Sequence, residues 1–158
     1  MKMIDKLFYV LTSQREMLEK IHYNQRFVKK AVNERNWQNL EQSLYRIQCL
    51  SDEFVILENE RIFVFESFGC SQNNDIYHIV SKLPKEKQKD AMNLFHEVRQ
   101  KLMICKIENN SINEYIKITK EFLQGIFDKV VPQRKNVIYG ISGVIKNQPT
   151  SLVLDAVL

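Results

Sequence analysis

Apolar residues recur every seven positions along most of this chain, and that spacing constrains the fold more than any other feature. Within residues 3–33, one row at this interval holds Ile4, Leu11, Leu18, Gln25 and Val32. A companion row holds Leu7, Gln14, Ile21 and Val28. Two such rows form the stripe by which one α-helix lies along another. Because Gln14 and Gln25 weaken the stripe, we expect a helix over residues 3–33 that depends on its neighbours for stability.

The same repeat continues in residues 37–68, with bulkier side chains. One row holds Leu40, Ile47, Phe54 and Phe68, and another holds Trp37, Leu44 and Phe65. Leu50, Leu57 and Val64 widen the apolar stripe, which is typical of a helix that faces more than one neighbour. We therefore predict that the helix over residues 37–68 occupies the centre of a bundle.

Residues 85–130 carry the longest repeat. One row holds Ala91, Val98, Cys105, Ile112, Thr119 and Ile126, and the other holds Phe95, Leu102, Asn109, Ile116, Leu123 and Val130. A helix of this length extends roughly 70 Å at 1.5 Å per residue. A buried Asn in such a row commonly fixes the register of packing at some cost in stability, and we expect this role for Asn109.

Turn-forming residues are scarce, since the chain has only 4 Gly and 3 Pro. Residues 33–36 form a plausible joint, and Asn36 can cap the helix that follows. Gly69 is the usual stop signal after a helix. Asp75 can cap a short helix over residues 75–83, which Pro84 ends. The fold class is therefore all-α: an elongated antiparallel bundle of long, coiled-coil-like helices in residues 1–130, followed by a short C-terminal tail, residues 131–158.

Composition excludes several classes of function. The net charge is only +4, and basic and acidic residues alternate in residues 85–90, as on a solvated helix start rather than a nucleic-acid patch. The three cysteines, Cys49, Cys70 and Cys105, lack the spacing of a disulfide framework or zinc site. Residues 1–5 lack the apolar core of a signal peptide, and no apolar stretch is long enough for a bilayer. We expect a cytoplasmic protein that neither inserts into membranes nor binds nucleic acid.

No catalytic motif is present in the sequence. Gly-rich phosphate loops, nucleophile elbows and His-Glu-x-x-His pairs are all missing. The single Glu-x-x-His, formed by Glu19 and His22, is one of the two that a di-iron bundle needs, and the heptads place it beside the stripe. We therefore predict a protein that is not an enzyme and has no metal or cofactor.

The tail differs from the helices before it. Val137, Ile138 and Tyr139 precede Gly140 and Gly143, and further apolar clusters follow. A tight turn that packs back on the bundle, in a small hairpin, is one interpretation. A recognition segment that becomes ordered on binding is the other. Composition alone does not separate the two.

This chain resembles the FlgN-type flagellar export chaperones. The helical architecture is similar over nearly the whole chain, and the tail element Val137-Ile138-Tyr139-Gly140-Ile141-Ser142-Gly143 is similar to the family's aliphatic-Tyr-Gly-x-x-Gly element. Heptads are unspecific, so the short tail element carries the resemblance. The apolar ending, residues 152–158, departs from the family pattern, and this ending would serve equally well as part of the bundle's own core.

The resemblance implies a role and a set of residues. Such chaperones bind the two hook–filament junction (hook-associated) proteins in the cytoplasm, prevent their premature assembly and deliver them to the flagellar type III export gate, a membrane protein. The export ATPase complex would be a further partner. By motif position, Tyr139 and Gly140 correspond to the element that docks to the gate. From apolar character and location, the cargo-binding surface is expected to comprise Phe122, Ile126, Val130, Val137, Ile138, Leu152 and Leu154.

A self-associating coiled-coil adaptor without cargo is the alternative function. The same apolar stripes would then join copies of the chain to one another. The sequence leaves open whether the protein is a monomer or a homodimer, and which junction protein would be preferred.

Overall fold

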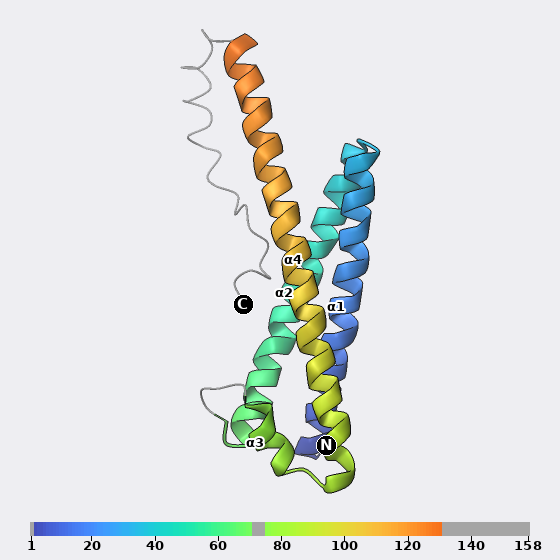
Figure 1. Cartoon of the computed structure of the whole chain (residues 1–158), viewed down its shortest axis with the longest axis vertical. Helices are drawn as coiled ribbons and strands as arrows, with labels where there is room; N and C mark the ends of the chain where they lie inside the picture. The colour runs from blue at the N-terminus through green and yellow to red at the C-terminus, as the bar shows by residue number, and fades with distance from the viewer. Residues whose placement is uncertain (1, 71–74, 131–158) are drawn as a thin grey trace.

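Four helices make up the part of the chain that the structure describes. This computed structural model describes residues 2–70 and 75–130. Its elements are α1 (Met3–Asn33), α2 (Trp37–Ser67), α3 (Ile76–Ser81) and α4 (Lys85–Val130). The three long helices run lengthwise in an elongated bundle, and α3 lies at the end where the chain begins (Figure 1). Consecutive long helices are antiparallel, so α1 and α4 run in the same direction. The all-α antiparallel bundle is confirmed.

The residues singled out as helix signals fix the helix ends. Asn36 Oδ1 accepts a hydrogen bond from the backbone N–H of Asn39, with an N···O distance of 3.1 Å. Asp75 Oδ1 accepts one from the backbone N–H of Tyr77 at 3.0 Å. Gly69 follows α2 with a φ of +87°, a conformation that side chains disfavour. Asn36 and Asp75 therefore cap the starts of α2 and α3, and Gly69 follows the end of α2, as the sequence predicts.

The central helix of the bundle is α1, not α2. α1 packs along both α2 and α4, whereas the backbones of α2 and α4 come close at few points. The prediction that the helix over residues 37–68 lies at the centre is therefore wrong. The apolar stripe of α2 includes Trp37, which is 55% exposed, and Leu50 and Leu57, which widen the stripe, are only half-buried. A wide apolar stripe therefore does not show whether a second helix or solvent lies against its outer residues.

Two buried glutamines connect α1 to its two neighbours. Gln14 and Gln25, the polar residues of the α1 heptads, are 0% and 1% exposed. Gln14 Nε2 donates to Glu58 Oε2 of α2 at 2.8 Å. Gln25 Nε2 donates to the backbone oxygen of Cys105 in α4 at 2.9 Å. Because a buried amide is costly without its partner, each glutamine fixes the position of α1 against one neighbour.

Ion pairs of alternating sign flank the contact between α1 and α4. The pairs are Asp5–Lys87 at 3.6 Å, Arg15–Glu97 at 3.3 Å, Glu19–Lys101 at 3.2 Å and Lys29–Glu108 at 2.6 Å. An exposed pair contributes at most about 1 kcal/mol to stability. Sliding α4 by one heptad, however, would bring Glu19 opposite Glu108, or Lys29 opposite Lys101. The pairs therefore select the register of the two parallel helices.

Truncation of a side chain on the inner face of α2 tests this packing. Ile47 is 0% exposed and Ile56 is 61% exposed, so the two residues differ in burial but not in type. We expect Ile47→Ala to lower the free energy of unfolding by about 2–5 kcal/mol, because it removes buried apolar contacts and leaves a cavity. Ile56→Ala should change it by less than about 0.5 kcal/mol. Urea denaturation followed by circular dichroism measures both, and equal losses would contradict the assignment of faces.

Candidate binding surface

The last part of α4 extends beyond the hairpin of α1 and α2. Lys29 of α1 pairs with Glu108 of the parallel α4, so Asn33, where α1 ends, lies level with Ile112. Ile112 is also the last buried residue of α4. Residues 113–130, hereafter the projecting end, continue for about 27 Å at 1.5 Å per residue. Figure 1 shows the end of this segment beyond the tip of the hairpin.

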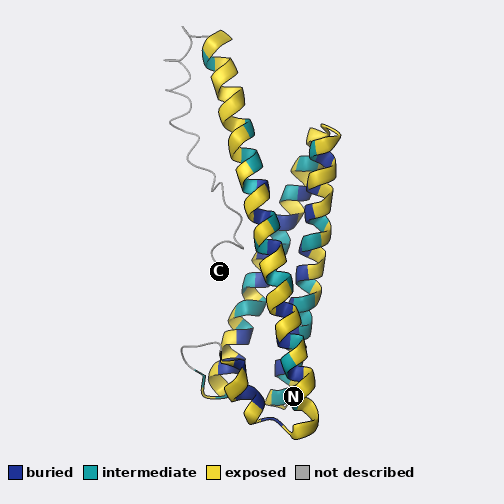
Figure 2. Ribbon diagram, viewed as in Figure 1, coloured by how far each residue is buried: buried dark blue, intermediate teal, exposed yellow. Residues whose placement is uncertain are grey.

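Large apolar side chains are exposed along the projecting end. They are Ile118 (58%), Phe122 (65%), Leu123 (59%), Ile126 (45%), Phe127 (38%) and Val130 (72%). The end of α4 is correspondingly coloured almost entirely as exposed in Figure 2. Single exposed apolar residues are normal, but a concentration of this kind on one short segment marks an interaction surface.

The exposed side chains cover more than one side of the helix. Leu123 and Val130 continue the heptad row that contains buried Asn109, so they extend the face that α4 turns toward α1 lower down. Ile118 and Phe122, four residues apart, form a second ridge beside that row. A partner that buried all of these side chains would therefore have to contact the projecting end on two sides.

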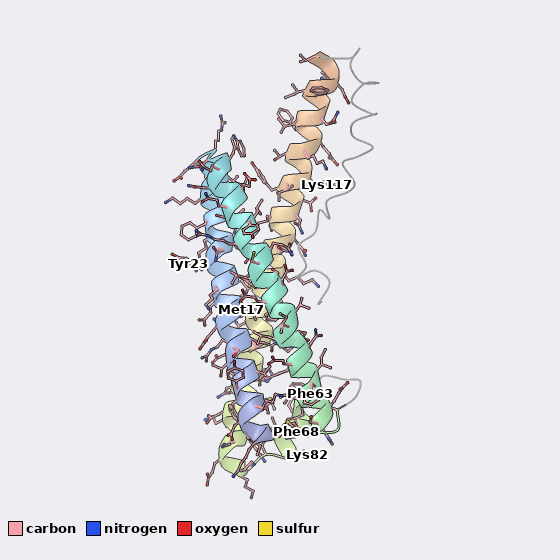
Figure 3. The ribbon with its side chains drawn as sticks, turned by 180° about the vertical axis from the view of Figure 1, so that it is seen from behind. Met17, Tyr23, Phe63, Phe68, Lys82 and Lys117 are labelled. Carbon is pink, nitrogen blue, oxygen red and sulfur yellow. The ribbon has the colours of Figure 1, made fainter. Side chains whose placement is uncertain are left out.

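Charge on the projecting end is balanced. Its acidic residues are Glu114, Glu121 and Asp128, and its basic residues are Lys117, Lys120 and Lys129. Lys117 extends from a part of α4 that stands apart from α1 and α2 (Figure 3). Since the charges cancel, apolar contact and not long-range attraction would provide most of the binding free energy here.

Three of the predicted cargo-binding residues lie on this surface. Phe122, Ile126 and Val130 are exposed together. Sequence reasoning missed Ile118, Leu123 and Phe127: Leu123 had been assigned to a packing row, and the other two lie off both rows. The remaining predicted residues, which are outside the described part of the chain, are Val137, Ile138, Tyr139, Gly140, Leu152 and Leu154.

The metal-ligand candidates have other roles. Glu19 pairs with Lys101 at 3.2 Å, and His22 lines a shallow pocket of about 290 Å³ between α1 and α4. In residues 2–70 and 75–130, no three His, Cys, Asp or Glu side chains gather closely enough to hold a metal ion.

Cys105 is a packing residue of the contact between α1 and α4. Its side chain is 1% exposed, and its Sγ donates to the backbone oxygen of Leu18 at 3.4 Å. Burial raises the pKa of the Cys105 thiol to about 12. Because the thiolate is the reactive form, this thiol is unreactive near neutral pH and is not a candidate nucleophile.

Comparisons with known proteins give no relative: no family model, curated protein or solved structure matches the chain. Within the described residues, no helix combines the length and the apolar character required to cross a bilayer. The projecting end of α4 therefore stands as the candidate site on its geometry alone.

The raised pKa of Cys105 predicts selective thiol labelling. At pH 8, a thiol of pKa about 12 is ionised in about one molecule in ten thousand, so Cys105 should remain unmodified by a disulfide reagent in the native protein. Half-buried Cys49 and Cys70 should react first. Cys105 should stay protected in the folded protein, and unfolding in guanidinium should release this third thiol. In Cys105→Ala the native phase should be unchanged, and three equal rates would contradict the burial of Cys105.

Proposed function

We propose that this protein is a cytoplasmic chaperone of the FlgN type, which binds hook–filament junction proteins before their export. The observation that carries the proposal is the projecting end of α4, where Phe122, Ile126 and Val130 are exposed beyond the bundle. A protein needs such a surface to cover apolar, coiled-coil segments of a cargo, since amphipathic helices bind through their apolar stripe.

The shape of the molecule supports this role. The buried core lies within residues 3–112 and includes side chains of all four helices, so this part forms a base from which residues 113–130 extend. A cargo helix that becomes ordered on the projecting end gives up part of its binding free energy to ordering. That loss favours a complex that forms in the cytoplasm and is released at the export gate.

The family resemblance adds a division of labour along the chain. Tyr139 and Gly140 would contact the export gate, whereas the projecting end and the apolar clusters after it would hold the cargo. The export ATPase complex would be a further partner. In this proposal the protein has no catalytic activity and requires no cofactor.

A self-associating adaptor is the second candidate function, because the projecting end would also pair with the same segment of another copy. Light scattering after size-exclusion chromatography separates the two candidates. The chaperone is expected as a monomer or homodimer that takes up cargo, and a stable higher oligomer that binds no junction protein would favour the adaptor.

Substitutions on the projecting end test cargo binding directly. We expect Phe122→Glu to weaken co-purification with junction proteins by at least about tenfold, because a charge would replace a central apolar contact. Ile56→Glu is the matched control, since Ile56 is equally exposed but lies on α2. Both variants should keep wild-type circular dichroism. Equal binding by the Phe122 variant and wild type would refute the assignment of this surface.

The tail assignment gives a separate prediction. Tyr139→Ala should leave cargo capture intact and stop delivery to the gate, so that junction proteins accumulate in the cytoplasm in complex with the chaperone. Deletion of residues 131–158 should leave the bundle folded and abolish cargo binding. Secretion assays and co-purification measure the two steps, and unfolding of the truncated protein would show that the tail belongs to the core.

A further inference from the structure

A groove lies between α2 and α4, whose backbones come close at few points. Its volume is about 350 Å³, and α1 contributes Gln14 to its lining. The apolar side chains that line it are Phe54, Phe95, Val98, Leu102 and Met103. Met103 is 64% exposed, so the edge of the groove on α4 is apolar and open to water.

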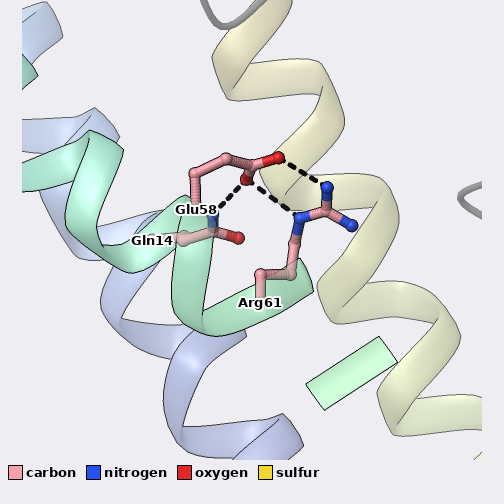
Figure 4. A network of polar contacts seen from close by, with 3 residues as sticks. All are labelled: Gln14, Glu58 and Arg61. Atoms are coloured by element: carbon pink, nitrogen blue, oxygen red, sulfur yellow. Dashed lines mark hydrogen bonds and ion pairs between the residues drawn. The ribbon is translucent and has the colours of Figure 1, made fainter. Parts of the chain in front are cut away.

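The base of the groove is a buried polar network with an unused acceptor. Glu58 accepts hydrogen bonds from Gln14 Nε2 at 2.8 Å and from Arg61 Nε at 2.9 Å (Figure 4). A carboxylate can only accept, so the amide nitrogen of Gln14 faces Glu58 and its Oε1 points elsewhere. This Oε1 is buried and has no hydrogen-bond partner within the described chain.

The charge of the groove is positive. Arg61, Arg99 and Lys106 line it together with one acidic residue, Glu58. Arg61 is 7% exposed and pairs with Glu58 at 2.5 Å, so its charge is largely compensated. Arg99 is exposed and Lys106 is half-buried, both on the α4 edge, where they remain available to an acidic ligand.

We propose that this groove binds an amphipathic α-helix of a partner protein, with its apolar stripe against Phe54, Leu102 and Met103 and its acidic side chains toward Arg99 and Lys106. A fourth helix in this position would complete a four-helix bundle, because α1 already packs along both α2 and α4. The site is separate from the projecting end, and it does not require the export role.

The test uses a labelled synthetic helix and the full chain. The probe is a 21-residue fluorescein-labelled peptide of about three heptads with Leu at the seam positions and Glu beside them, and its binding is followed by fluorescence anisotropy. Met103→Glu should weaken binding at least about tenfold, because it places a like charge against the acidic helix. Ile107→Glu is the matched control, since Ile107 is 60% exposed on α4 but does not line the groove, and it should change binding by less than about twofold.

A second peptide, with Lys in place of Glu, tests the charge. It should bind at least about tenfold more weakly than the acidic peptide, and Arg99→Glu should reduce that difference. If Met103→Glu proves misfolded by circular dichroism, Arg99→Glu alone serves as the groove variant. Equal binding of both peptides, or equal loss in the Met103 and Ile107 variants, would overturn the proposal.

Two further results would reassign the groove. Loss of peptide binding in Phe122→Glu would show that the peptide binds the projecting end instead. Concentration-dependent dimerisation that disappears in Met103→Glu would show that a second copy of this chain fills the groove. Retained peptide binding in Phe122→Glu, by contrast, supports the groove even if that variant no longer takes up junction proteins, so the two proposals fail independently.

Discussion

The burial of α1 between α2 and α4 is the interaction on which the rest of this structure depends. Both heptad rows of α1 are used, and its side chains Leu7, Leu11, Leu18 and Ile21 are completely shielded from water. Burial of this apolar surface provides most of the stabilisation, at about 25 cal/mol per Å². Since apolar contact is not directional, Gln14 and Gln25 supply what the stripe lacks, a defined position against each neighbour.

The helices and their ends were predictable because their signals are local. A heptad row identifies the buried face, and Asn36 or Asp75 caps a helix through residues two or three positions away. Which helix packs against which was not predictable, because a heptad repeat identifies the buried face of a helix but not the helix that covers this face. Trp37 belongs to the apolar stripe of α2 but faces solvent, and Leu50 and Leu57 widen that stripe while remaining only half-buried. The projecting end reflects the difference in length between two parallel helices, because α4 has 46 residues and α1 has 31.

The candidate site was predictable only in part for a related physical reason. Apolar residues in a heptad row look the same whether a helix of the same chain or another protein covers them. Phe122, Ile126 and Val130 were singled out by their place near the end of the last helix, whereas Leu123 was attributed to internal packing. α1 ends at Asn33, which lies level with Ile112 of α4. The heptad rows of α4 are therefore covered by α1 up to Ile112 and uncovered after it, and the sequence repeat does not show this limit.

The two exposed surfaces differ in the selectivity that they can provide. The projecting end is apolar and balanced in charge, so many amphipathic segments would satisfy it. The groove has a positive edge, so a ligand without matching acidic groups loses binding free energy there. A tolerant surface on an extension and a discriminating one on the rigid bundle would allow a single small protein to bind different partners without competition between them.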